Sequence, residues 1–250
     1  GVLLSGFASV RDAVEEVRTC RADLALLPIE NSTAGSINET YDLLAEGGLT
    51  INAEVVSKVE HCLITLPGAK LDQLRRVISH PQALMQCETY LRSLPWVRSL
   101  AEFDTAGAAR KVRESNDPTL AAIASEGAAK MLGLEVLRRG IQSQPSNSTR
   151  FVEVAIEAAE SPGDRDHKTS LLVILERNAV TLGEVLMAFG RRGIDVAKLE
   201  SRPIPETPFR YRFYLDVEAH ASDQLMQEAM EEARALTGEL RQLGTYPRAD

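Results

Sequence analysis

The chain has 250 residues, of which 44% are hydrophobic and 26% charged, and its formal net charge is -8. This length allows one large domain or two ordinary ones, and the acidic balance disfavours nucleic acid or an anionic membrane as a partner. No apolar run approaches the roughly 18 to 20 residues that cross a bilayer. The three cysteines lie far apart, and the four histidines show no paired spacing. We therefore expect a cytoplasmic protein with no disulfide framework and no metal site.

The first part of the chain alternates strand and helix patterns. In chain order we expect a helix over 9–17, a short strand over 24–27 ended by Pro28, a helix from 38, a strand at 77–78, a helix over 106–113 capped by Asp104 or Thr105, a strand over 120–124 and a helix over 126–132. Ser79 is expected to cap a further helix in a capping box with Gln82. This alternation predicts an α/β domain with a largely parallel sheet.

The second part has a different pattern. The polar stretch 157–167 contains a Pro-Gly pair and is expected to be a linker between domains. Beyond it we expect strands over 169–175, 194–201, 209–217 and 239–246, with helices marked by apolar residues at 182–189 and 225–236. In the stretch 209–217 apolar and polar residues alternate, which predicts one buried face and one wet face. The order βαββαβ is that of a ferredoxin-like unit.

Four polar segments follow expected strands, at 28–32, at 79–86, at 104–106 and at 147–151. Ligands bind to open α/β sheets at the carboxyl ends of strands. Each segment taken alone is also explained by a turn or a helix cap. Spacing alone therefore predicts an α/β domain with several polar loops where its strands end.

Together, three of these segments carry a resemblance. The stretches PIENS at 28–32, SHPQALMQC at 79–87 and NSTRF at 147–151 occur in the order typical of prephenate dehydratases, and LESRP at 199–203 resembles a motif of ACT domains in such enzymes. The resemblance implies a two-lobed periplasmic-binding-protein-like catalytic domain over 1–157, a linker over 158–167 and a ferredoxin-like βαββαβ ACT regulatory domain over 168–250. Relatives open with a strand and a glycine-rich turn, and this chain begins after that point.

The resemblance also implies an activity, the conversion of prephenate to phenylpyruvate with loss of CO2 and water, without cofactor or metal. It assigns catalytic roles to Thr149, Arg150, Glu30 and Asn31, and substrate contacts to Ser32, Ser79, Gln82, Gln86 and Phe151. Thr149 would donate to the leaving hydroxyl group. Arg150 would pair with a substrate carboxylate or with Glu30. His80 is either a general acid or, as we favour, a structural residue.

The ACT resemblance implies a phenylalanine sensor that pairs across a homodimer or homotetramer. Glu200, Ser201 and Arg202 would lie near the effector, although an exposed strand-end charge explains Arg202 equally well. Val180 stands where relatives have a glycine at the start of the first ACT helix, and a β-branched side chain there narrows the approach to the backbone. Two alternatives remain open, an arogenate dehydratase and a non-catalytic two-lobed binding protein with an amino-acid sensor.

Overall fold

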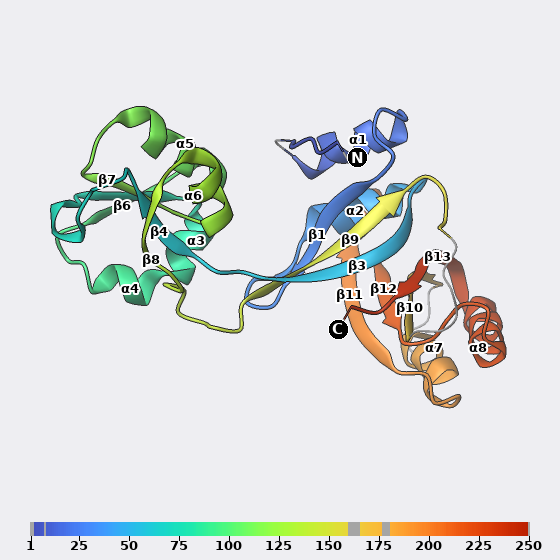
Figure 1. Ribbon diagram of the computed structural model, residues 1–250. Helices are drawn as coiled ribbons and strands as arrows, with labels where there is room; N and C mark the ends of the chain where they lie inside the picture. Colours follow the sequence, from blue (N-terminus) through green and yellow to red (C-terminus); the bar gives the residue numbers. More distant parts are fainter. Residues whose placement is uncertain (1–2, 8, 160–165, 177–180, 250) are drawn as a thin grey trace. The chain divides into compact units, whose positions relative to one another are not determined.

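The computed structural model describes residues 3–7, 9–159, 166–176 and 181–249 (Figure 1). The chain divides into two compact units, which we call unit 1 (Gly1–Ser57 and Thr149–Asp250) and unit 2 (Lys58–Ser148). The chain thus leaves unit 1 once and returns to it once. Unit 1 contains two four-stranded sheets, and unit 2 contains one five-stranded sheet.

The N-terminal sheet of unit 1 has the order β2-β1-β9-β3. Its strands are β1 (Ala25–Asn31), β2 (Gly35–Ser36), β3 (Thr50–Lys58) and β9 (Ser148–Ala155), and its helices are α1 (Val10–Arg18) and α2 (Asn38–Glu46). Both predicted helices are confirmed, and α1 and α2 pack on β1 and on each other. The predicted end of the first strand at Pro28 is wrong. β1 runs on to Asn31 through a register irregularity between Pro28 and Glu30, which accommodates a residue that lacks an N–H group.

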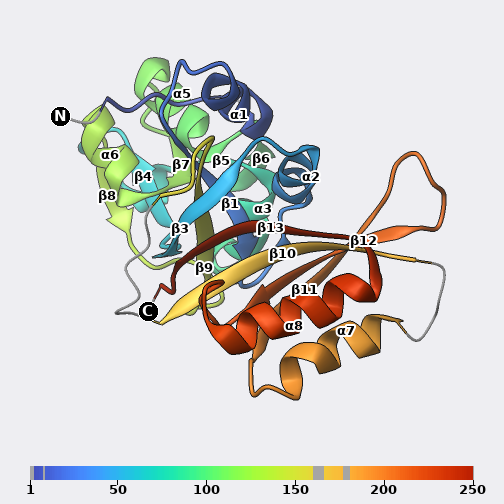
Figure 2. The same cartoon turned by 90° about the vertical axis from the view of Figure 1, so that its right-hand side faces the viewer.

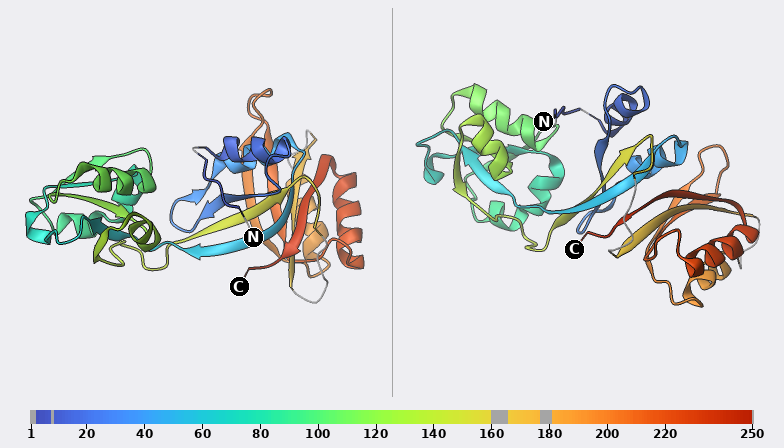
Figure 3. Two further views of the ribbon diagram at one scale, coloured as in Figure 1. Left: turned by 45° about the horizontal axis from the view of Figure 1, so that its top comes forward. Right: turned by 45° about the vertical axis from the view of Figure 1, so that its right-hand side comes forward.

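The C-terminal sheet of unit 1 shows the predicted element order βαββαβ. The elements are β10 (His167–Leu175), α7 (Thr181–Gly190), β11 (Val196–Pro203), β12 (Tyr211–Val217), α8 (Gln224–Ala235) and β13 (Thr237–Pro247). The sheet order is β11-β12-β10-β13, and every neighbouring pair is antiparallel. Helices α7 and α8 lie side by side on one face of this sheet, in orange and red in Figures 2 and 3.

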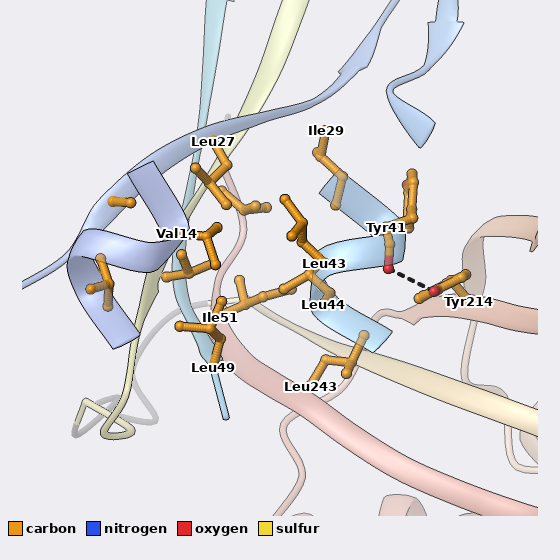
Figure 4. Close-up of a cluster of buried hydrophobic side chains, with 14 of the residues drawn as sticks. Val14, Leu27, Ile29, Tyr41, Leu43, Leu44, Leu49, Ile51, Tyr214 and Leu243 are labelled. Carbon is orange, nitrogen blue, oxygen red and sulfur yellow. Dashed lines mark hydrogen bonds between the residues drawn. The ribbon is translucent and has the colours of Figure 1, made fainter. Parts of the chain in front are cut away.

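The other face of the C-terminal sheet is also buried. Tyr214 and Asp216 were predicted on a wet face of β12, but both are buried, so this prediction is wrong. The reason is tertiary packing, because Tyr214 joins a core cluster with side chains of α1, α2, β1 and β3 (Figure 4). The Tyr214 hydroxyl donates to the Tyr41 carbonyl oxygen over 2.7 Å, and the two ring centroids lie 4.8 Å apart. The two sheets of unit 1 therefore share one core.

Unit 2 is built on a mixed sheet of order β6-β5-β7-β4-β8. Its elements are β4 (Cys62–Thr65), the 3-10 turn η1 (Leu71–Gln73), β5 (Arg76–Ser79), α3 (Pro81–Gln86), α4 (Glu88–Arg92), β6 (Arg98–Ala101), α5 (Thr105–Ser115), β7 (Leu120–Ala124), α6 (Glu126–Leu132) and β8 (Glu135–Arg138). β5 is parallel to β6 and β7, whereas β4 is antiparallel to β7 and β8. The prediction of a largely parallel sheet is therefore wrong. In unit 2, β4 runs opposite to the other four strands, because only the 3-10 turn η1 and no crossover helix connects it to β5. In the N-terminal sheet, β1 is antiparallel to both β2 and β9.

Two predicted features fall partly outside the described residues. The expected linker over 157–167 includes residues 160–165, and Val180 belongs to the stretch 177–180. β9 ends at Ala155 and β10 begins at His167. Within the described ranges, no helix has both the length and the apolar character needed to cross a membrane.

Candidate active site

A tight hairpin between β1 and β2 fixes the side chain of Asn31. The Asn31 Oδ1 atom accepts hydrogen bonds from the backbone N–H of Thr33 (3.1 Å), the Thr33 hydroxyl (2.7 Å) and the backbone N–H of Ala34 (2.9 Å). Gly35 has a φ of +83°, the left-handed backbone that lets the chain return along β1. Asn31 is only 8% exposed. The side-chain oxygen of Asn31 thus accepts hydrogen bonds within the turn, and these bonds fix the direction of its side-chain NH2 group.

The Asn31 amide group points at Thr149. The two residues are register partners on the antiparallel strands β1 and β9, although 118 positions separate them in sequence. Asn31 Nδ2 donates to Thr149 Oγ1 over 3.0 Å. A hydroxyl oxygen that accepts one hydrogen bond keeps its own proton for a second partner. Thr149 can therefore act as a positioned donor to an oxygen atom of a ligand.

Arg150, the next residue along β9, is surrounded by carboxylates. Its Nη1 atom lies 2.7 Å from Asp216 Oδ2 and 3.1 Å from Glu54 Oε2, and its Nε atom lies 3.4 Å from Glu30 Oε2. Burial alone lowers the pKa of Arg150, but Asp216 and the nearby tyrosines raise this pKa more, so the guanidinium group stays charged. The predicted pairing of Arg150 with Glu30 is confirmed.

A second layer of contacts holds the partners of Arg150. Glu54, whose side chain is 1% exposed, accepts from Lys168 Nζ over 2.8 Å. Asp216 accepts from the Ser170 hydroxyl over 2.6 Å, and that hydroxyl lies 2.7 Å from the Tyr246 hydroxyl. Buried charges of this kind are stable only when each is paired and hydrogen-bonded. Arg150 therefore forms ion pairs with both sheets, with Asp216 of the C-terminal sheet and with Glu30 and Glu54 of its own sheet.

In unit 2 the structure corrects the predicted helix cap. Ser79 is the last residue of β5, fully buried, and its hydroxyl donates to the Ile123 carbonyl oxygen over 2.7 Å. The N-cap of α3 is His80, whose Nδ1 atom accepts from the backbone N–H of Gln82 over 3.2 Å, and Pro81 is the first helical residue. The capping-box prediction is wrong because Ser79 is still paired within the sheet. The structural role favoured for His80 agrees with this contact.

Gln86, at the end of α3, is held by a histidine. Its Oε1 atom lies 2.7 Å from His61 Nε2, and its backbone carbonyl accepts from the N–H of Ser143 over 2.8 Å. His61 is 8% exposed, and its backbone N–H donates to Gln142 Oε1 over 3.0 Å. The Gln86 oxygen thus accepts the imidazole N–H, and this contact fixes the orientation of the side chain.

The predicted site residues thus fall into two groups. Unit 1 contains Glu30, Asn31, Ser32, Thr149, Arg150 and Phe151, and unit 2 contains Ser79, Gln82 and Gln86. Ser32 lies in the hairpin turn, Phe151 faces Pro28 across the β1–β9 pair, and Gln82 lies in the first turn of α3. Among the described residues, no group of three or more His, Cys, Asp or Glu side chains is arranged to hold a metal ion.

Comparison with known proteins decides the family. Residues 2–159 match the family model described as PDT, prephenate dehydratase. This chain belongs to the prephenate dehydratase family. It is 44% identical over 250 residues to arogenate dehydratase 3, chloroplastic, of Arabidopsis thaliana, which covers 94% of this chain and 59% of that protein. It is 35% identical over 243 residues to a bifunctional chorismate mutase/prephenate dehydratase of Enterobacter agglomerans, with 97% and 62% covered. The chain thus spans less than two thirds of the length of these curated relatives.

Two solved structures show the same fold. The prephenate dehydratase of Arthrobacter aurescens in complex with L-Phe has a TM-score of 0.87 and 33% identity, over 96% of this chain and 79% of that chain. A protein described as GqqA, a novel type of quorum quenching acylase, has a TM-score of 0.87 and 34% identity, over 96% and 87%. The matches cover both sheets of unit 1 and the sheet of unit 2, so this member of the prephenate dehydratase family has the α/β fold of those proteins.

Sequence reasoning missed several residues of this network. Glu54 and Lys168 belong to no motif, and Asp216 was assigned to a wet face. His61 was considered only as a metal ligand. One signal was available, because Asp216 lies between the apolar residues Leu215 and Val217, and a buried acid usually has a partner. The identity of that partner depends on strand register across the two sheets, which no local pattern encodes.

Proposed function

We propose that this chain is a dehydratase that converts prephenate to phenylpyruvate, a carbon–oxygen lyase of phenylalanine biosynthesis. The observation that carries the proposal is the hydrogen bond from Asn31 Nδ2 to Thr149 Oγ1, which orients a hydroxyl donor on β9. Family membership supports the same reaction. Prephenate is a cyclohexadienol with two carboxylates, so it needs one donor at its hydroxyl group and further donors at its carboxylates.

The reaction proceeds by loss of two groups from the ring. The bond to the ring carboxylate breaks, CO2 departs, and its electron pair enters the ring as the C4–O bond breaks. The departing oxygen needs a proton or a strong hydrogen bond, since hydroxide is a poor leaving group. Thr149 supplies that hydrogen bond and Asn31 fixes its direction. A threonine hydroxyl is a weak acid, so it relays a proton from the surrounding polar network and does not ionise itself.

The remaining predicted residues hold the substrate. Gln82 and Gln86 lie on the same side of α3, and we assign both to contacts with the substrate. Ser32 and Phe151 flank Asn31 and Thr149 on their strands. Ser79 contributes indirectly, because its hydroxyl group fixes the end of β5. Glu30 and Arg150 form an ion pair, and this pair holds the adjacent residues Asn31 and Thr149 in place on their strands.

Arogenate is the second candidate substrate. It carries an amine where prephenate carries a keto group, and the elimination is otherwise the same. The observation that favours it is the 44% identity to a protein described as an arogenate dehydratase. That relative is also described as chloroplastic, whereas the wide spacing of the cysteines supports a cytoplasmic location for this chain.

We propose further that the C-terminal βαββαβ unit is an ACT domain that senses L-phenylalanine. The A. aurescens structure, described as a complex with L-Phe, supports this assignment. Glu200, Ser201 and Arg202 lie on β11, which is the edge strand of its sheet. An edge strand can pair with a second copy of the chain, which agrees with a homodimer or a homotetramer.

The test is turnover of both substrates by the full-length protein, with and without L-phenylalanine. Phenylpyruvate from prephenate, read by its absorbance in alkali, would establish the first reaction, and phenylalanine from arogenate the second. A change of rate with added L-phenylalanine would establish the sensor. A folded protein that converts neither substrate would refute the proposal and favour a binding role or the acylase activity described for GqqA.

A further inference from the structure

Lys198 of the C-terminal sheet contacts the β1–β2 hairpin that carries Asn31. Lys198 lies on β11, and its Nζ atom is 2.8 Å from Glu30 Oε1 on β1 and 3.2 Å from the Ser36 hydroxyl on β2. Glu30 and Ser36 are register partners across the hairpin. Glu200 lies 3.9 Å from the same ammonium group and accepts from Ser36. The Lys198 side chain therefore contacts both strands of the hairpin. Glu200, on the same strand β11, contacts Lys198 and the hairpin.

The same hairpin residues lead directly to the proposed catalytic pair. Glu30 lies opposite Arg150, and Asn31 lies opposite Thr149. Successive side chains of a strand point to opposite faces, so the ion pair occupies one face and the catalytic pair the other. Lys198, Glu30 and Arg150 form a continuous chain of charges that ends on Asp216 of the C-terminal sheet. The first and last residues of this network of charges, Lys198 and Asp216, thus belong to the C-terminal sheet.

Burial makes this chain of charges sensitive to the loss of one member. The side chains of Lys198 and Arg150 are 16% and 11% exposed, and that of Asp216 is 10% exposed. Removal of Lys198 would leave Glu30 with the longer 3.4 Å contact to Arg150 and would break the link from β11 to the hairpin, so the strand that carries Glu30 would be held less tightly. A shift of Glu30 moves the adjacent backbone of Asn31, whose amide group defines the position of the Thr149 hydroxyl.

We propose that Lys198 is a positioning residue for the Asn31–Thr149 pair, so that the C-terminal sheet completes the active site of its own chain. This inference rests on the proposed dehydratase site. It gives the C-terminal sheet a role in basal turnover, before any effector binds. It also assigns the side chain of Glu200 to the hairpin, where it contacts Ser36. A displacement of β11 would then reach the catalytic pair through Lys198.

The kinetic test compares Lys198→Met with Lys198→Arg and with Arg241→Met. Arg241 is the matched control, because it is a second cation of the C-terminal sheet that reaches the N-terminal layer, where it donates to the Ala45 carbonyl over 2.6 Å. We expect Lys198→Met to lower kcat roughly 10- to 100-fold with little change in KM, since misplacement of a catalytic group by about 1 Å has effects of this size. Lys198→Arg should restore most of kcat, and Arg241→Met should keep it.

A second measurement follows the hairpin itself, by hydrogen–deuterium exchange of the amides at 29–37 and 148–151. Lys198→Met should speed exchange in both segments, and Arg241→Met should not. Unchanged kcat and unchanged exchange in Lys198→Met would overturn the inference, as would equal losses in Arg241→Met. If Lys198→Met does not fold, Lys198→Gln takes its place. If the wild-type protein converts neither substrate, the dehydratase proposal fails, while the exchange data still decide whether Lys198 positions the hairpin.

Discussion

Gly244 on β13 lies against the backbone of β3 in the other sheet of unit 1, so its replacement by alanine should lower the stability of the protein. A Cβ atom built at this position would lie 2.0 Å from the Ile51 carbonyl oxygen, 2.8 Å from its carbonyl carbon and 2.9 Å from its Cβ atom. The nearest of these are backbone atoms of β3, so no side-chain rotation relieves the overlap. The strands must separate by about 1.5 Å to reach an ordinary contact distance.

The expected loss of stability follows from that separation. Overpacking of a well-packed core costs typically about 1–3 kcal/mol, and a clash between two backbones belongs at the upper end, so we expect about 3 kcal/mol. Leu243 and Tyr246, which flank Gly244, are buried in the shared core and would be displaced with it. Urea denaturation followed by far-UV circular dichroism measures the change.

The matched control for this substitution is Gly183→Ala. Gly183 lies in α7, and a Cβ atom there would meet nothing within 4 Å. Alanine is favoured over glycine in a helix by up to about 1 kcal/mol, so this variant should be as stable as the wild type or slightly more stable. If Gly244→Ala is as stable as Gly183→Ala to within about 0.5 kcal/mol, the tight packing of β13 against β3 in a shared core is refuted.

Three further predictions concern buried polar groups. The Tyr41 hydroxyl is buried with no hydrogen-bond partner among the described residues, so Tyr41→Phe should leave the unfolding free energy unchanged or raise it, whereas Tyr214→Phe should lower it by about 1–2 kcal/mol in urea titrations because the Tyr41 carbonyl loses its donor. Burial raises the pKa of Tyr214 to about 12 and raises the pKa values of Tyr41 and Tyr246 as well. Their contribution to stability is therefore complete below the unfolded value of 10.0 and is lost as the pH rises from there towards 12; the urea midpoint should fall over this range, and more gently in Tyr214→Phe. His61→Phe should raise KM about tenfold and lower the unfolding free energy by about 1 kcal/mol, because Gln86 loses the hydrogen bond that orients it; an unchanged KM would separate His61 from substrate binding.

Local signals in the sequence predicted part of the fold well. The strand Leu120–Ala124 and the helix Glu126–Leu132 have the predicted bounds, since a short apolar run, a capping serine and a closing glycine all act within a few residues. Asp104, one of the two caps expected for the helix over 106–113, caps α5 for the same reason. The βαββαβ order followed from the change of periodicity along the second half of the chain.

Features that depend on register or on a second layer escaped prediction. Asp216 and Tyr214 are buried because α2 and the N-terminal sheet cover a face that alternation alone marks as wet. His80 and not Ser79 caps α3, since one further residue of β5 pairs with its neighbour. The candidate site divides in the same way. Its hairpin follows from Asn31 and Gly35, whereas the link from Lys198 to Glu30 joins residues 168 positions apart in sequence.

The most direct test of the account is the turnover of Thr149→Val beside Thr149→Ser in the full-length protein. Valine keeps the branched shape and loses the hydroxyl group, and serine keeps the hydroxyl group that Asn31 orients. We expect Thr149→Val to fold normally by circular dichroism and to lose kcat by at least about a hundredfold, the size of a lost proton-transfer or hydrogen-bonding group, while Thr149→Ser stays within about tenfold of the wild type. Near-normal turnover of prephenate and arogenate by Thr149→Val would contradict the central claim that this hydroxyl assists the leaving group.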